Sequence, residues 1–118
     1  MSDVTQKLAK VCQAIEEKKG EDVLVLDISQ ISSFTDFFIL CQGKNGKQIQ
    51  AICDAIREIL AKEKIRPAHV EGYRNAEWVL LDYVDFVVHI FSEPTRRFYN
   101  LEKLWSDGTE VNRQALSA

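Results

Sequence analysis

Apolar residues recur every three or four positions in three segments of the chain, a spacing that places them on one face of an α-helix. The first segment starts after Ser2 or Asp3, either of which can cap a helix, and stops at Gly20. The second follows Asn45, another capping residue, and the third starts near Pro94. The three apolar faces consist of Val4, Leu8, Val11, Cys12 and Ile15, then Ile49, Ile52, Cys53, Ile56, Ile59 and Leu60, then Phe98, Leu101, Leu104 and Trp105. The sequence therefore predicts three helices, the last of them short.

Five shorter apolar runs lack this spacing and are rich in β-branched and aromatic residues, which is typical of strands. They span residues 23–28, 36–42, 68–71, 77–83 and 85–92. Only Val84 separates the last two runs, which predicts a tight hairpin. In the run 77–83, Trp78 and Leu80 lie on one face, and Val79 and Leu81 lie on the other. Both faces are apolar, so either helices cover both or a partner covers one.

The order helix, two strands, helix, three strands, helix predicts an α/β fold with a mixed five-stranded sheet flanked by helices. A chain of 118 residues is the usual size of one compact domain, and it contains no repeat or linker that would mark a second one. We expect this domain to span residues 1–107. Residues 108–118 have no sustained apolar period and are predicted to form a flexible C-terminal tail.

Charge and composition limit the class of partner and the cellular location that we expect for the protein. The formal net charge of -3 argues against a protein that grips nucleic acid mainly through phosphates, so we expect no direct sequence-specific nucleic-acid binding and favour a basic protein partner. No apolar run reaches the roughly 20 residues that cross a bilayer, and the charged start is unlike a signal peptide. Cys12, Cys41 and Cys53 match no disulfide or metal pattern and are expected to be buried. A cytoplasmic protein, or a mature organellar one, is predicted.

The chain shows no pattern that commits it to catalysis. Its two histidines, His69 and His89, have no zinc-site spacing, so we expect no metal, no cofactor and no catalytic residue. No Asp-x-Asp or Asp-x-Glu pair lies inside an apolar strand. An enzyme that uses Asp27, Asp82 or Asp85 with Mg²⁺ is the alternative, and carboxylates are the ligands that Mg²⁺ prefers.

The two tryptophans and a polar group near the last helix are candidates for recognition. Tryptophan is enriched at the buried centres of interfaces, so Trp78 is either an interface residue or a core aromatic, while Trp105 is assigned to packing. The polar group is either a recognition patch or a solvated helix face with charge pairing. It consists of Arg96, Arg97, Tyr99 and Glu102.

Seven short motifs follow one another between residues 4 and 107. They are Thr35-Asp36-Phe37-Phe38, Gly43 with Gln48 and Ala51, Glu71-Gly72, Trp78-Val79-Leu80-Leu81-Asp82, Val87-Val88-His89-Ile90-Phe91, Arg97-Phe98-Tyr99 and Leu101-Glu102-Lys103-Leu104-Trp105. In this order and spacing they closely resemble the Iojap-like ribosomal silencing factors. One departure concerns the predicted hairpin, where Val84 stands in place of the glycine common in the family, and valine disfavours the positive φ that glycine permits.

The resemblance implies a fold related to nucleotidyltransferases but without their catalytic carboxylates. It also implies a translational repressor that binds ribosomal protein fourteen of the large ribosomal subunit and blocks association with the small subunit. The partner-binding residues expected on this basis are Trp78, Leu80, Asp82, Glu71, Asp85, His89, Arg97 and Tyr99. The apolar strand face also allows a homodimer or a self-associating scaffold.

Overall fold

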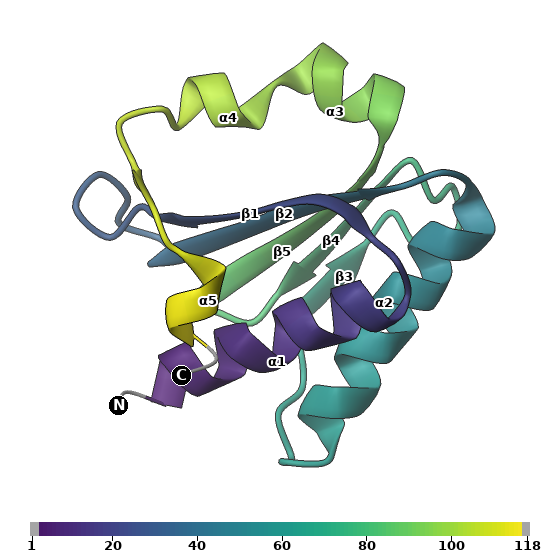
Figure 1. The fold of residues 1–118 in the computed structure, drawn as a ribbon, viewed down its shortest axis with the longest axis horizontal. Helices are drawn as coiled ribbons and strands as arrows, with labels where there is room; N and C mark the ends of the chain where they lie inside the picture. The colour runs from purple at the N-terminus through teal and green to yellow at the C-terminus, as the bar shows by residue number, and fades with distance from the viewer. Residues whose placement is uncertain (1–2, 117–118) are drawn as a thin grey trace.

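The computed structural model describes residues 3–116, in which six strands form one mixed sheet with helices on both faces (Figure 1). The strand order is β3-β4-β5-β2-β1-β6. β2 and β5 run parallel at the centre, and every other neighbouring pair is antiparallel. The strands are β1 (Glu21–Asp27), β2 (Phe37–Gly43), β3 (His69–Glu71), β4 (Trp78–Asp82), β5 (Phe86–Ser92) and β6 (Thr109–Glu110). The predicted α/β class with a mixed sheet is confirmed, and the predicted count of five strands is wrong.

The sixth strand and a further helix come from the segment predicted to be a flexible tail. β6 pairs with the end of β1, and α5 (Arg113–Leu116) packs against α1 (Asp3–Glu17), with Leu116 buried. Both side chains of β6 are exposed, so backbone hydrogen bonds alone make it a strand. A two-residue strand of this kind leaves no apolar alternation in the sequence, which is why the prediction missed it.

Two long helices cover one face of the sheet. α1 and α2 (Gly46–Ala61) lie on the same side, together with α5 (Figure 1), and α2 packs on β2, β4 and β5. The predicted cap of α2 is confirmed, since the Asn45 side chain accepts a hydrogen bond of 2.9 Å from the backbone N–H of Gln48. Of the two cap residues predicted for α1, Asp3 is the first residue of the helix, and Ser2 lies outside the described residues. The three cysteines are buried as predicted, and burial raises the pKa of Cys41 to about 12.

The opposite face carries two short helices where one was predicted. α3 (Glu93–Tyr99) ends at Asn100, whose φ of 46° is left-handed, and α4 (Leu101–Leu104) begins immediately afterwards. Asparagine tolerates this conformation better than most residues. The break divides the predicted apolar face: Leu101 and Trp105 pack on the sheet, whereas Phe98 is 81 % and Leu104 is 73 % exposed.

Arg96 fastens α3 to the sheet, which corrects its interpretation as a solvated or recognition residue. The side chain is buried, and its Nη1 donates a 2.7 Å hydrogen bond to the backbone carbonyl of Asp22 in β1. Its Nε forms an ion pair of 3.2 Å with Glu102. A buried guanidinium with these partners holds the short helix against the sheet.

The hairpin between β4 and β5 is as tight as predicted. Val84 takes a φ of 73°, and the N–H of Asp85 donates to the carbonyl of Tyr83 across it, which makes a γ-turn. The Asp82 carboxylate accepts a 2.8 Å hydrogen bond from the Val84 N–H, and the Thr35 hydroxyl donates to the Val84 carbonyl. The positive φ expected where the family commonly has glycine is therefore present, and these side chains hold valine in it.

Among residues 3–116, no helix is long and apolar enough to cross a membrane.

Candidate partner-binding surface

β4 is the strand whose two faces differ most. Val79 and Leu81 are fully buried on the side of α2, whereas Trp78, Leu80 and Asp82 are only half-buried on the side of α3. Helices therefore lie over both faces of the sheet, but the short pair α3 and α4 leaves the β4 side chains partly open. The half-open face is the one that carries three of the predicted partner-binding residues.

Trp78 sits at the centre of an aromatic group that joins β4, β5 and α3. Its ring centroid lies 4.8 Å from that of Tyr99 and 5.1 Å from that of Phe91. Its indole N–H donates a 3.1 Å hydrogen bond to Nδ1 of His89. Tyr99 is 52 % exposed, so the group reaches solvent at this end. Trp78 is thus packed on one side and open on the other. It combines features of both predicted alternatives, a core aromatic and an interface residue.

Glu71 joins Trp78 and Leu80 through strand pairing. In the β3–β4 register Glu71 lies opposite Leu80, so the two side chains share one face at the edge of the sheet. Gly72 follows with a φ of +80°, and a Cβ there would stand 2.0 Å from the Trp78 carbonyl oxygen. Only glycine allows the chain to turn this closely over the backbone of Trp78.

A groove of about 540 Å³ opens beside Trp78, between α3 and the loop that joins β3 to β4. It is lined by Gly72, Asn75, Glu77, Trp78, Pro94, Thr95, Phe98 and Tyr99. Within residues 3–116, neither Glu71 nor Glu77 has an ion-pair partner, and both are exposed. We call Trp78, Leu80, Glu71, Tyr99 and Phe98 the Trp78 surface. Its centre is aromatic and aliphatic, and Glu71, with Glu77 of the adjoining groove, forms its acidic rim.

The remaining predicted residues are distributed around this surface. Asp82 and Asp85 lie at the other end of β4, roughly 13 Å along the strand from Trp78. His89 is 3 % exposed and stands behind Trp78. Arg97 lies on the other flank of α3, where it forms an ion pair of 2.9 Å with Glu93 beside a different hollow. The structure thus groups Trp78, Leu80, Glu71 and Tyr99, and it separates Arg97 from them.

Phe98 and Glu77 also belong to this region, although the sequence pattern predicts neither as a partner-binding residue. Phe98 was assigned to the apolar face of one continuous helix, and the break at Asn100 turns it outward instead. The sequence pattern places Glu77 only at the start of the strand run 77–83. The Arg97-Phe98-Tyr99 motif was the only signal that pointed to Phe98.

Asp27 and Asp82, two of the three carboxylates considered for Mg²⁺, lie too far apart to share one ion. Asp27 ends β1 and Asp82 ends β4, and β5 and β2 separate those strands, which is roughly 14 Å at the usual strand spacing. Asp27 accepts hydrogen bonds from the backbone N–H and the hydroxyl of Ser29. No group of three or more potential metal ligands occurs within residues 3–116.

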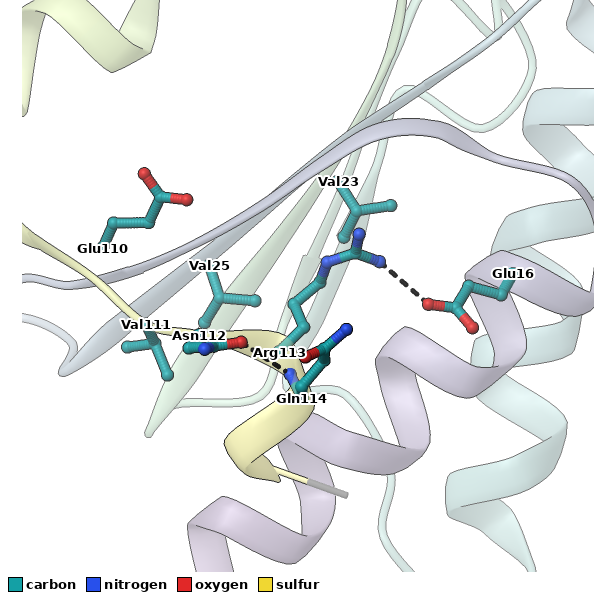
Figure 2. A pocket seen from close by; sticks show the side chains of 8 residues that line it. All are labelled: Glu16, Val23, Val25, Glu110, Val111, Asn112, Arg113 and Gln114. Carbon is teal, nitrogen blue, oxygen red and sulfur yellow. Dashed lines mark hydrogen bonds and ion pairs between the residues drawn. The ribbon is translucent and has the colours of Figure 1, made fainter. Parts of the chain in front are cut away.

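A larger hollow of about 720 Å³ lies on the other side of the sheet, against α1 (Figure 2). In Figure 2 the Arg113 side chain reaches across it to Glu16, with a nitrogen–oxygen distance of 2.8 Å, above Val23 and Val25 of β1. The Asn112 side chain accepts a hydrogen bond from the N–H of Gln114. These contacts fasten the C-terminal segment to α1, and none of the predicted partner-binding residues lines this hollow.

Comparison with known proteins gives consistent matches over nearly the whole chain. A family model described as "Ribosomal silencing factor during starvation" matches residues 2–118. A ribosomal silencing factor RsfS from Halalkalibacterium halodurans is 41 % identical over 103 residues, which cover 87 % of this chain and 88 % of that protein. The chloroplastic protein Iojap of Zea mays is 36 % identical over 101 residues, 86 % of this chain and 44 % of that protein. A crystal structure of a Chromobacterium violaceum protein superposes with a TM-score of 0.86 at 28 % identity, covering 94 % of this chain and 92 % of the other.

Proposed function

Because this chain belongs to the family of ribosomal silencing factors, which confirms the resemblance of its motifs to Iojap-like proteins, we propose that it represses translation by binding the large ribosomal subunit. The contact in this proposal is ribosomal protein fourteen on the intersubunit face. Bound there, the protein occupies the space of the small subunit and blocks subunit association in the cytoplasm. Such exclusion needs affinity and no chemistry, so the protein is proposed to be non-catalytic.

The Trp78 surface is the observation that carries this proposal. It places a half-exposed tryptophan beside Tyr99 and Phe98, and large aromatic side chains dominate the energy of protein interfaces. Its acidic rim complements a basic protein, because opposite charges guide association and fix orientation. Ribosomal proteins that contact RNA are generally basic, as phosphate binding requires.

We also propose that the fold is related to that of nucleotidyltransferases but lacks their catalytic carboxylates. The wide separation of Asp27 from Asp82 supports the non-catalytic side of it. A titration with nucleoside triphosphate and Mg²⁺ tests the enzyme alternative directly. Turnover that depends on Mg²⁺ and disappears in Asp82→Ala would establish that alternative.

Co-sedimentation with purified ribosomal subunits tests the main proposal. The protein is expected to sediment with isolated large subunits and not with small ones, and to lower the yield of joined ribosomes when both are mixed. Equal binding to both subunits, or binding to neither, contradicts the proposal. If small subunits associate normally with large subunits that carry the protein, the proposed steric block is contradicted.

Two charge reversals at opposite edges of the same sheet make a matched pair for this assay. Glu71→Lys places a cation on the Trp78 surface, whereas Glu110→Lys makes the same change on β6, at the far end of the strand order. Both side chains are exposed, so both variants should fold. Only Glu71→Lys is expected to weaken large-subunit binding and its dependence on salt.

Self-association through the same surface is proposed for the protein without its partner. An apolar surface of this kind can be shielded by a second copy. Sedimentation equilibrium should then show a monomer–dimer mixture that Trp78→Ala shifts toward monomer. A strict monomer at all accessible concentrations contradicts self-association without affecting ribosome binding.

A further inference from the structure

His89 is a polar residue in an aromatic environment. It is 3 % exposed, and its ring lies edge-to-face with Phe38 at a centroid distance of 4.7 Å and nearly parallel to Phe91 at 6.0 Å. The one hydrogen bond that its side chain makes within the described residues comes from the Trp78 indole N–H, 3.1 Å from Nδ1. The histidine thus connects the interior of the sheet to the Trp78 surface.

The hydrogen bond sets the chemical form of the ring. Because Nδ1 accepts, it carries a lone pair, and the single proton of the neutral imidazole is on Nε2. Burial lowers the pKa of His89 to about 4, so the ring is neutral near pH 7. Nε2 is itself buried and has no hydrogen-bond partner among residues 3–116.

Packing alone does not account for a histidine at this position. A buried N–H without a partner costs free energy, and a leucine would fill much of the same space without that cost. The feature that leucine cannot supply is the acceptor for the indole of Trp78. Trp78 needs such an anchor because it is only half-buried, with Tyr99 packed against it and solvent beside it.

We propose that His89 is a positioning residue whose Nδ1 holds the Trp78 indole in the orientation in which it meets the partner. The inference rests on the proposed function, in which Trp78 lies at the centre of the interface. An indole fixed in advance loses less rotational freedom on binding, so the hydrogen bond contributes to affinity without touching the partner. His89 then acts through Trp78 and makes no direct contact.

Nuclear magnetic resonance tests the pairing itself. In ¹⁵N-labelled protein at pH 7, we expect a scalar coupling across the hydrogen bond between the indole nitrogen and Nδ1, and nitrogen shifts of a neutral ring protonated on Nε2. Trp78→Phe identifies the signal by removing it, and the indole of Trp105 serves as the internal reference. A ring protonated on Nδ1, or an indole of Trp78 that exchanges its proton as fast as an exposed one, overturns the proposal.

Two substitutions of His89 separate positioning from packing. His89→Asn keeps an acceptor close to the place of Nδ1, whereas His89→Leu fills the space and removes the acceptor. We expect His89→Leu to weaken large-subunit binding about 10-fold while the urea midpoint stays equal or rises, and His89→Asn to remain within about 3-fold of the parent. In a Trp78→Phe background, His89→Leu should have no further effect, because the indole is already absent.

Each outcome of these experiments decides whether His89 positions Trp78. Parental affinity in folded His89→Leu, an equal loss in both variants, or a full effect of His89→Leu in the Trp78→Phe background overturns the positioning role. A parent that shows the coupling but does not bind large subunits contradicts the proposed function and leaves the pairing intact. The coupling measurement uses the unmodified protein and therefore holds even where a variant fails to fold.

Discussion

The two faces of the sheet are built differently, although they share the same strands. The face under α1 and α2 is an aliphatic core that includes fully buried Ile52, Ile56 and Leu81. The face under α3 and α4 is smaller and aromatic, and Trp78 and Leu80 at its margin are only half-buried. One face is sealed and the other is left open beside β4, so the difference separates a region that stabilises the fold from one suited to recognition.

Helix length accounts for this difference. α1 and α2 have 15 and 16 residues, whereas α3 and α4 have 7 and 4. At 1.5 Å per residue, α3 is about 10 Å long, which is too short to cover a six-stranded sheet. The uncovered part falls at the β3–β4 edge, where the acidic rim lies.

The sharpest comparison uses two neighbouring leucines of β4. Leu81→Ala should lower the free energy of unfolding by about 2–5 kcal/mol, because it opens a cavity in the sealed core. Leu80→Ala removes the same atoms from the half-open face and should cost less than half as much, since part of that side chain is already in water. Urea unfolding measures both. Equal losses would show that the two faces are equally important for stability.

Trp78→Ala should separate recognition from stability. We expect a loss of about 2 kcal/mol or more in the free energy of large-subunit binding, the size typical of a central interface residue. Ring contacts with Phe91 and Tyr99 are lost as well, so a smaller fall in stability accompanies it. Affinity and urea unfolding are measured on the same preparation. A variant as stable as the parent that binds equally tightly would remove Trp78 from the interface.

Acid should weaken the aromatic face through His89. Burial lowers its pKa in the folded protein to about 4, below the ordinary histidine pKa of 6.5, so the unfolded chain takes up the proton first as pH falls. The contribution of neutral His89 to the free energy of unfolding is present above pH 6.5 and is lost as pH falls toward 4. The expected loss between pH 7 and pH 5 is about 2 kcal/mol.

A substitution of His89 isolates that effect from the titration of carboxylates. His89→Leu should unfold in urea with about 2 kcal/mol less pH dependence over this range than the parent. A parental pH dependence in His89→Leu would mean that His89 is not the buried neutral group.

The smallest expected effect concerns the strained hairpin. Val84→Gly should raise the free energy of unfolding by about 1 kcal/mol, because relief of positive φ on a β-branched residue exceeds the extra entropy of glycine in the unfolded chain. Asn100→Gly, at another non-glycine residue with positive φ, should change little, since asparagine tolerates its φ of 46°. Thermal unfolding gives both values, and a Val84→Gly variant less stable than the parent contradicts the assigned strain.

Local patterns of the sequence were sufficient for most elements and for part of the surface. The helix faces of α1 and α2, the cap at Asn45, the hairpin at Val84 and the alternation along β4 each depend on residues close together in the chain. Periodicity and turn chemistry act over this short range, so they could be predicted. The grouping of Trp78 with Leu80 followed from the same alternation.

The tertiary structure decided what depends on distant contacts. Backbone pairing with β1 made β6, a left-handed Asn100 split the last helix, and Arg96 reached 74 positions back to Asp22 to set α3 over the sheet. The last two of these contacts place α3 and α4, and so determine which face of β4 stays open. The pairing of Trp78 with His89 likewise arises only when β4 and β5 align, because a hydrogen bond between residues on different strands depends on register and leaves no mark in either strand's own pattern.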